Sequence, residues 1–189
     1  MPIEPLGIQS DSAIVLARAD RSFDDLFVEL FDAHFHRLFR YLVRLSGDSD
    51  LAADIAQDAF VRLHRRGSVP DSPGGWLVSV AMNLFRNAES ARRRRARLLT
   101  PERGRRAHAD PSPSPADRVE AEETRRQVRL ALQRLPERDR AMLLLRAEGY
   151  NYRDIATALD IRESSVGTLL ARAKRGFREG YEDVIDALG

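Results

Sequence analysis

The chain has 189 residues, no cysteine, 43% hydrophobic and 32% charged residues, a composition typical of a globular protein with one domain or two small ones. Without cysteine it can form neither a disulfide nor a thiolate zinc site. The formal net charge of only +2 conceals eight arginines against one glutamate in residues 92–106 and five basic residues against one glutamate in residues 162–178. Two cationic surfaces favour a polyanion contacted at two places, although the first could also be a solvated helix end.

Residues 1–22 are expected to form a flexible leader. Their longest apolar run, residues 13–17, is too short for the core of a signal peptide or for a membrane span. We therefore expect a cytoplasmic protein that does not insert into a membrane.

Residues 23–95 are expected to form a first helical domain. Apolar residues recur at intervals of three and four from Phe23, which predicts a long helix ending near Ser46. After the break at Gly47, a second run of the same spacing predicts a helix that ends at about Arg65.

The segment 67–75 contains two prolines and three glycines, which predict a loop. A third helix is expected to begin at Trp76 and to continue into the run Arg92–Arg95. Three helices with short connections predict a compact bundle that can bury a small core.

A linker is expected over residues 96–117, where periodicity is lost and prolines alternate with serines. Residues 118–189 then form the second domain. A helix in this domain stops before Pro136, and Gly149 ends the next one. No segment shows a strand pattern, so the sequence predicts an all-α fold of two small helical domains.

A helix-turn-helix is predicted at the end of the second domain. Asn151 is a candidate N-cap, residues 160–162 form the turn, and Ser164 is a candidate N-cap of the second helix. That second helix carries small polar residues on its first turns and cations after them, which suits a major groove and its phosphates. A plain three-helix bundle with a solvated basic face is the alternative.

Three strings carry a resemblance: DLAADIAQDAFVRLHRR, GGWLVSVAMNLFRNAESARRRR and LPERDRAMLLLRAEGYNYRDIATALDIRESSVGTLLARAKRGFRE. In this order they resemble bacterial sigma-70 factors of the extracytoplasmic function (ECF) type. The resemblance implies a region 2 bundle of three to four helices over residues 23–95 and a region 4 helix-turn-helix over 118–189. It also implies a factor without catalytic residues, cofactor or metal that binds core RNA polymerase and directs promoter-specific initiation. The implied partners are the β′ clamp helices, the β flap and promoter DNA, and an anti-sigma factor is a further candidate.

The second helix resembles the surface that these factors apply to the β′ clamp helices. Polar side chains at intervals of three and four on a helix that otherwise faces a core suit such a contact. Ordinary solvated side chains are the alternative. The residues expected to bind the polymerase are Asp54, Gln57, Asp58 and Arg62.

The loop and the third helix resemble the part of region 2 that melts the −10 element and captures a flipped base. Asn83 and Asn87, one turn apart, are the amides expected to read that base, although exposed surface amides are the alternative. Trp76 could stack on a base or pack in the core. The expected −10 residues are Ser68, Val69, Asp71, Val80, Asn83, Arg86, Asn87, Arg92, Arg93, Arg94 and Arg95.

Region 4 is expected to read the −35 element. Two positions depart from the family pattern: Asp160 stands where a turn glycine is common, and Leu170 stands where a basic residue is common. Aspartate tolerates the left-handed backbone, so the turn is expected to survive. The expected −35 residues are Arg162, Ser164, Ser165, Thr168, Arg172, Lys174 and Arg175.

Two other classes of function remain open at this point. One is a helix-turn-helix regulator that binds DNA without joining the polymerase. The other is an enzyme with a metal centre formed by Asp54, Asp58, His34, His36 and His64. Because His34 and His36 point in nearly opposite directions on a helix, they cannot easily share an ion.

Overall fold

The computed structural model describes residues 22–98 and 115–188. The described part is helical and contains no strand, which confirms the all-α prediction. The expected leader, apart from Ser22, and residues 99–114 of the expected linker lie outside the described residues. The last linker residues, from Pro115, already belong to a helix.

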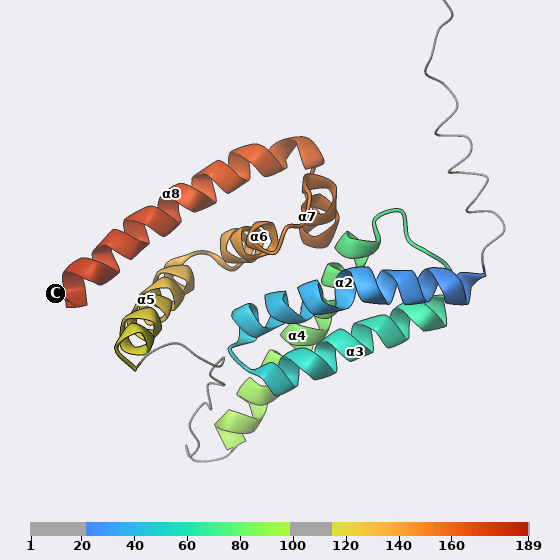
Figure 1. Ribbon diagram of the computed structural model, residues 1–189, viewed down its shortest axis with the longest axis horizontal. Coiled ribbons are helices and arrows are strands. Elements are labelled where there is room, and N and C mark those ends of the chain that lie inside the picture. The colour runs from blue at the N-terminus through green and yellow to red at the C-terminus, as the bar shows by residue number, and fades with distance from the viewer. Residues whose placement is uncertain (1–21, 99–114, 189) are drawn as a thin grey trace, which may run out of the picture.

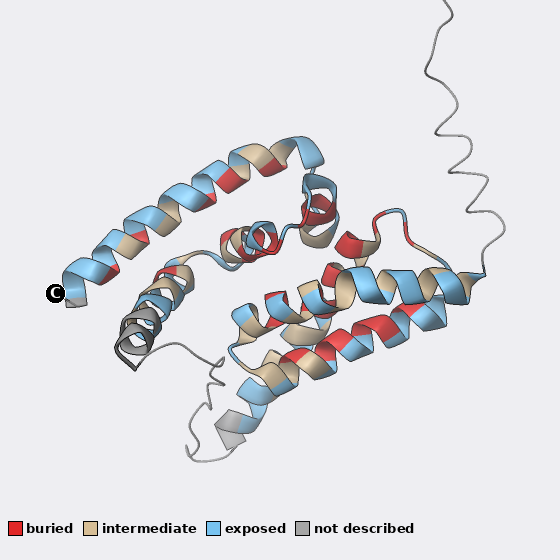
Figure 2. Cartoon of the chain, viewed as in Figure 1, coloured by how far each residue is buried: buried red, intermediate tan, exposed pale blue. Residues whose placement is uncertain are grey.

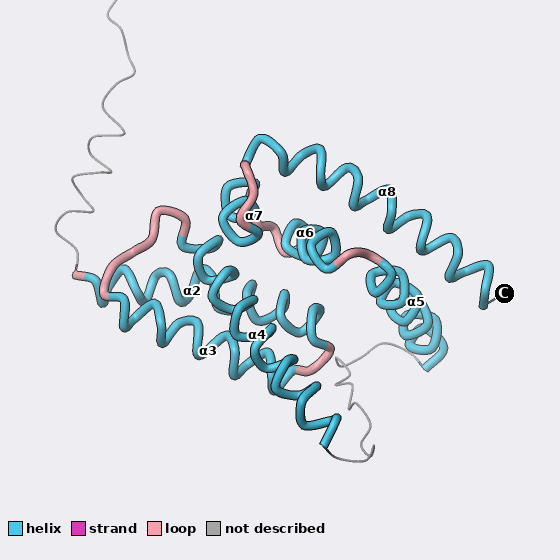
Figure 3. The backbone as a smooth tube through the Cα atoms, turned by 180° about the vertical axis from the view of Figure 1, so that it is seen from behind, coloured by secondary structure: helices cyan, strands magenta, loops and turns pink. Residues whose placement is uncertain are grey.

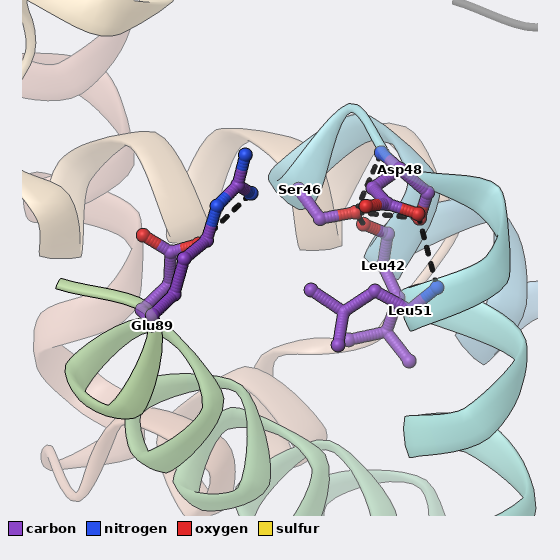
Figure 4. Close-up of polar contacts among 6 residues, drawn as sticks. Leu42, Ser46, Asp48, Leu51 and Glu89 are labelled. Carbon is purple, nitrogen blue, oxygen red and sulfur yellow. Dashed lines mark hydrogen bonds and ion pairs between the residues drawn. The ribbon is translucent and has the colours of Figure 1, made fainter. Parts of the chain in front are cut away.

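The first half contains helices α2 (Phe23–Ser46), α3 (Ser49–Arg66) and α4 (Pro73–Leu98). α2 and α3 form an antiparallel pair joined by a tight turn, shown in Figure 4. Gly47 takes the left-handed conformation, with φ of 69°, and ends α2. Asp48 then caps α3, since its Oδ1 accepts a hydrogen bond from the Leu51 amide at 3.1 Å.

The start of α4 corrects the sequence prediction. The helix begins at Pro73, three residues before the expected Trp76, so part of the predicted loop 67–75 is helical. Proline is well tolerated at the first helical position because no donor is needed there. The Trp76 amide donates to the Ser72 carbonyl at 2.8 Å and closes the first turn around Gly74 and Gly75.

The second half contains helices α5 (Pro115–Arg134), α6 (Glu137–Ala147), α7 (Tyr152–Leu159) and α8 (Glu163–Leu188). Asn151 caps α7 as predicted, its Oδ1 accepting from the Asp154 amide at 2.8 Å. Asp160 takes the left-handed conformation, with φ of 52°, so the turn survives as predicted. The predicted cap at Ser164 is wrong, because α8 begins at Glu163 and Ser164 lies within its first turn.

The two halves pack against each other. Figures 1 and 3 show α7 beside the start of α4, and α6 beside α2. One continuous cluster of buried side chains runs through both halves, as the buried faces in Figure 2 illustrate. It includes Leu42 and Leu77 from the first half and Met142, Ile155 and Val166 from the second. The sequence, read segment by segment, does not predict this shared core.

Candidate nucleic-acid interface

The residues expected to bind the polymerase lie on the outer face of α3. The helix buries Ile55, Ala59 and Leu63 against the bundle, and its spacing therefore turns the other face outward. Within the described chain, neither Asp54 nor Asp58 has an ion-pair or hydrogen-bond partner. All four predicted residues are exposed: Asp54, Gln57, Asp58 and Arg62. The structure thus presents one acidic and polar surface that is free to meet a partner.

The expected −10 surface follows the loop after α3 and the outer face of α4. Asn83 and Asn87 are exposed one turn apart, so the predicted pair of amides shares one face of the helix. Ser68 and Asp71 are exposed in the loop, whereas Val69 and Val80 are half-buried.

Trp76 is half-buried and packs against the core, while the Arg66 guanidinium lies over its ring at 5.7 Å from the centroid. The Arg66 Nε also donates to Ser68 Oγ at 3.2 Å. The half-buried indole therefore contacts both the core and the Arg66 side chain. This arrangement favours the core role of Trp76 over base stacking.

The basic part of α4 contains two arginines with acidic partners, followed by three without one among the described residues. Arg86 Nε donates to Glu137 Oε1 of α6 at 3.1 Å, which ties α4 to the second half. Arg92 lies 3.8 Å from Glu89 on its own helix. Arg93, Arg94 and Arg95 are exposed and have no ion pair among the described residues. This run is an accessible cationic surface of the kind that binds phosphate.

The expected −35 surface lies on the first turns of α8 and just before them. Arg162, Ser164 and Thr168 are exposed, and Ser165 is half-buried. Farther along, Lys174 and Arg175 are exposed. Leu170 is only 4% exposed and belongs to the core. A side chain at this position therefore points away from the surface on which a basic residue could contact DNA.

Arg172 has an internal partner that the sequence did not reveal. Its Nη2 donates to both carboxylate oxygens of Asp139, at 2.8 and 3.1 Å, across α8 and α6. Asp139 is 5% exposed, whereas the Arg172 side chain is 55% exposed. The pair therefore ties α8 to α6, and the exposed part of the guanidinium still faces solvent.

Two further buried carboxylates lie where the halves meet. Glu148 pairs with Arg40 and Arg44 of α2, each at 2.9 Å. Asp154, on the first turn of α7, accepts hydrogen bonds from Ser72 and from the Gly75 amide. The spacing of residues within one segment does not predict these contacts, because the partners are distant in the sequence.

Aromatic and imidazole groups between α2 and the second half stay uncharged at neutral pH. Burial raises the pKa of Tyr150 to about 12 and moves the pKa of Tyr41 in the same direction. Burial, together with the neighbouring Arg37, lowers the pKa of His34. The Arg37 guanidinium also lies over the Tyr150 ring, 4.2 Å from its centroid.

The residues of the metal alternative are not brought together. His34 Nδ1 lies 2.8 Å from Arg37 Nη2, while His64 contacts Phe27 and lies 3.8 Å from Asp24. Within residues 22–98 and 115–188, no group of three or more possible metal-binding side chains occurs. In the same ranges, no helix has the length and apolarity to cross a membrane.

Comparison with known proteins agrees with this arrangement. The family model described as Sigma-70 region 2 matches residues 30–97, and that described as Sigma-70, region 4 matches residues 125–175. The ECF RNA polymerase sigma factor SigL of Mycobacterium tuberculosis is 32% identical over 155 residues, covering 79% of this chain and 85% of the relative. The chain belongs to the sigma-70 family, ECF type.

Other relatives match a larger share of this chain. SigE of Mycolicibacterium smegmatis, also an ECF RNA polymerase sigma factor, is 29% identical over 177 residues, covering 92% of this chain and 67% of the relative. The RNA polymerase sigma-H factor of Pseudomonas aeruginosa is 31% identical over 181 residues, 90% of each chain. As a sigma factor the protein directs transcription initiation, and such factors are not themselves enzymes.

The fold also matches a solved structure. A chain from the co-crystal structure of the sigma factor RpoE with the anti-sigma factor NepR, from Bartonella quintana, aligns with a TM-score of 0.59 and 18% identity. The alignment covers 85% of this chain and 96% of that chain. The similarity therefore extends over both helical halves.

Proposed function

We propose that this sigma factor binds core RNA polymerase through the outer face of α3 and reads a promoter with two separate surfaces. The observation that carries the proposal is the exposure of Asp54, Gln57, Asp58 and Arg62 on one helix face without local partners. Unpaired, exposed carboxylates do not stabilise the fold. A surface that binds a partner therefore explains their presence better than a structural role does.

In region 2, we assign recognition and melting of the −10 element to the loop and to α4. The amides Asn83 and Asn87 would read an extruded base, and the run Arg92–Arg95 would hold the backbone. Ser68, Val69, Asp71 and Val80 would line the pocket. Arg86 becomes available for phosphate once its bond to Glu137 is released.

In region 4, we assign the −35 element to the start of α8. Arg162, Ser164, Ser165 and Thr168 would approach base edges, as residues on the first turns of a recognition helix do. Lys174 and Arg175 would meet phosphate. Arg172 can use its exposed N–H groups on DNA while Nη2 stays on Asp139.

Core polymerase, promoter DNA and the cytoplasm are the partners and location that this role requires. The β′ clamp helices and the β flap are the expected contacts on the polymerase. Because the solved RpoE chain is complexed with an anti-sigma factor, we include such a factor as a regulatory partner.

Run-off transcription with core polymerase on a promoter library tests the proposal. We expect specific start sites that require both proteins, and weak duplex binding by the sigma factor alone, since each half has only a modest basic face. Tight sequence-specific binding without polymerase, combined with no transcripts, would instead identify a helix-turn-helix regulator that does not join the polymerase.

A further inference from the structure

The side-chain amide of Asn83 has a hydrogen-bond partner within its own helix. Arg86 Nη1 donates to Asn83 Oδ1 at 3.4 Å, from one turn farther along α4. A guanidinium carries only donors, so the amide atom that faces it must be the oxygen and not the nitrogen. The contact therefore fixes the polarity of Asn83: its oxygen faces Arg86, and its Nδ2 group is left to donate elsewhere.

The guanidinium that holds this oxygen is itself held from the other half of the chain. Arg86 Nε donates to Glu137 Oε1 at 3.1 Å, and the remaining N–H groups are left for phosphate. The bond to Asn83 joins residues three apart on one helix, so it does not depend on Glu137. At 3.4 Å, with the Arg86 side chain 53% exposed, this bond is weak in water, and a bound nucleotide that excludes water strengthens it.

Asn87, the second amide assigned to the −10 element, has no such contact. It is exposed, and it has no hydrogen bond from its side chain to any residue within 22–98 and 115–188. Its amide can therefore turn by about 180° and offer either its oxygen or its NH2 group. The two amides are thus unequal, because only Asn83 has a fixed polarity.

This inequality matters because bases differ in the groups that an amide can read. An amide oxygen accepts from the exocyclic amino group of cytosine or adenine, whereas an amide NH2 donates to a carbonyl oxygen or a ring nitrogen. An amide that can turn satisfies either kind of group and discriminates poorly. An amide held in one orientation meets the wrong group with donor against donor, and the unpaired polar groups that result make discrimination large.

We infer that Arg86 is a positioning residue for promoter reading, which holds the Asn83 oxygen so that Asn83 reads the captured base only as a hydrogen-bond donor. This inference rests on the proposed function, because it takes Asn83 as a reader of the −10 element. It adds the direction of the hydrogen bond and the residue that sets it. The atom read on the base is a carbonyl oxygen or a ring nitrogen, not an exocyclic amino group.

Side-chain mobility in the free chain tests the contact without DNA. Nitrogen-15 relaxation gives an order parameter for the NH2 group of each asparagine. We expect a higher value for Asn83 than for Asn87 in the parent, and equal values in Arg86→Ala. Glu137→Ala is the matched control, because it removes the other partner of Arg86 and should leave the difference in place. Equal values in the parent overturn the inference.

Base selectivity of the holoenzyme with core polymerase tests the reading. Fork templates carry each of the four bases in turn in a single-stranded −10 segment, and Kd values are compared at the position where Asn83→Ala reduces selectivity most. We expect the best base to bind at least about tenfold more tightly than the worst in the parent, and less than about threefold in Arg86→Ala. Arg86→Lys, whose ammonium can donate to the same oxygen, should recover most of this ratio. Arg93→Ala removes only a cation and should weaken all four bases alike.

The variant Asn83→Asp decides the direction of the hydrogen bond. A carboxylate can keep the contact with Arg86 but cannot donate to a base. We expect binding to the preferred base to weaken at least about tenfold, and the preference to move to a base that offers an amino group. Asn87→Asp adds the same charge one turn away and should weaken all four bases without reversing their order. If Asn83→Asp keeps the parental preference, the amide oxygen reads the base and the inference is wrong.

The inference and the proposed function fail in different ways. If Asn83→Ala removes selectivity but Arg86→Ala does not, Asn83 reads the base without help from Arg86, so the inference is refuted and the proposed function stands. If Asn83→Ala leaves selectivity unchanged at every −10 position, the assignment of Asn83 to the −10 element is refuted, and the inference falls with it even where relaxation shows an ordered amide.

Discussion

Replacing Arg172 by alanine should lower the free energy of unfolding of the protein, apart from any effect on DNA binding. Arg172 Nη2 lies 2.8 and 3.1 Å from the two oxygens of Asp139, a carboxylate that is 5% exposed. Hydrogen bonds to charged groups contribute about 1.5–3 kcal/mol. Since the arginine side chain is 55% exposed, solvent screens the pair and we expect a loss of about 2 kcal/mol. At about 2–4 °C per kcal/mol for a chain of this size, the Tm should fall by about 4–8 °C.

Thermal and urea unfolding followed by far-ultraviolet circular dichroism measures this loss. Arg175→Ala is the matched control: it removes an exposed arginine from the same helix and should change the free energy of unfolding by less than about 0.5 kcal/mol. Adding Asp139→Asn to Arg172→Ala should recover part of the loss, because an amide does not leave a buried charge unpaired. If Arg172→Ala is as stable as the parent but binds a −35 duplex more weakly, this reasoning is refuted. Arg172 would then contribute to DNA binding alone.

Three further predictions concern the other surfaces and the pH dependence. Replacing Asp54 and Asp58 by lysine should weaken binding to core polymerase at least about tenfold, while the helix content stays that of the parent. Unchanged affinity in a pull-down titration would show that these two residues are ordinary solvent-exposed side chains. Replacing Asn83 and Asn87 by alanine should reduce permanganate reactivity of melted −10 thymines more than initial promoter binding, and equal loss of both steps would contradict the assignment to melting. Because the pKa of His34 is lowered in the fold, the unfolded chain takes up its proton first as the pH falls below 6.5, so the free energy of unfolding should decrease there. His34→Gln should flatten this slope in urea titrations, and parallel slopes would show that another group causes it.

The sequence was most informative where structure depends on neighbouring residues. The spacing of apolar residues from Phe23 predicted α2 up to Ser46, and the cap at Asn151 and the left-handed turn at Asp160 were both confirmed. These features are set within one or two helical turns, so a single segment contains all the information that determines them.

Features that depend on distant residues were missed. The early start of α4 places Gly74 and Gly75 in a helix, against their ordinary tendency, because the Asp154 carboxylate in the other half accepts a hydrogen bond from the Gly75 amide. The partner of Arg172 is likewise 33 residues away. A single sequence gives no means of pairing one buried acid with one of many arginines, so it can suggest candidate DNA-binding residues but not their internal hydrogen bonds.

The hydroxyl of Ser72 has two alternative hydrogen-bonding roles. In this structure it donates to the Asp154 carboxylate at 2.7 Å, and the Gly75 amide donates to the same carboxylate. A serine in the same place at other helix starts accepts a bond from the amide three residues ahead. If the Asp154 carboxylate is removed, Ser72 can therefore rotate and cap α4 itself, so that the helix exchanges one cap for another and keeps its two-glycine first turn. Loss of the Asp154 carboxylate would then leave the start of α4 folded.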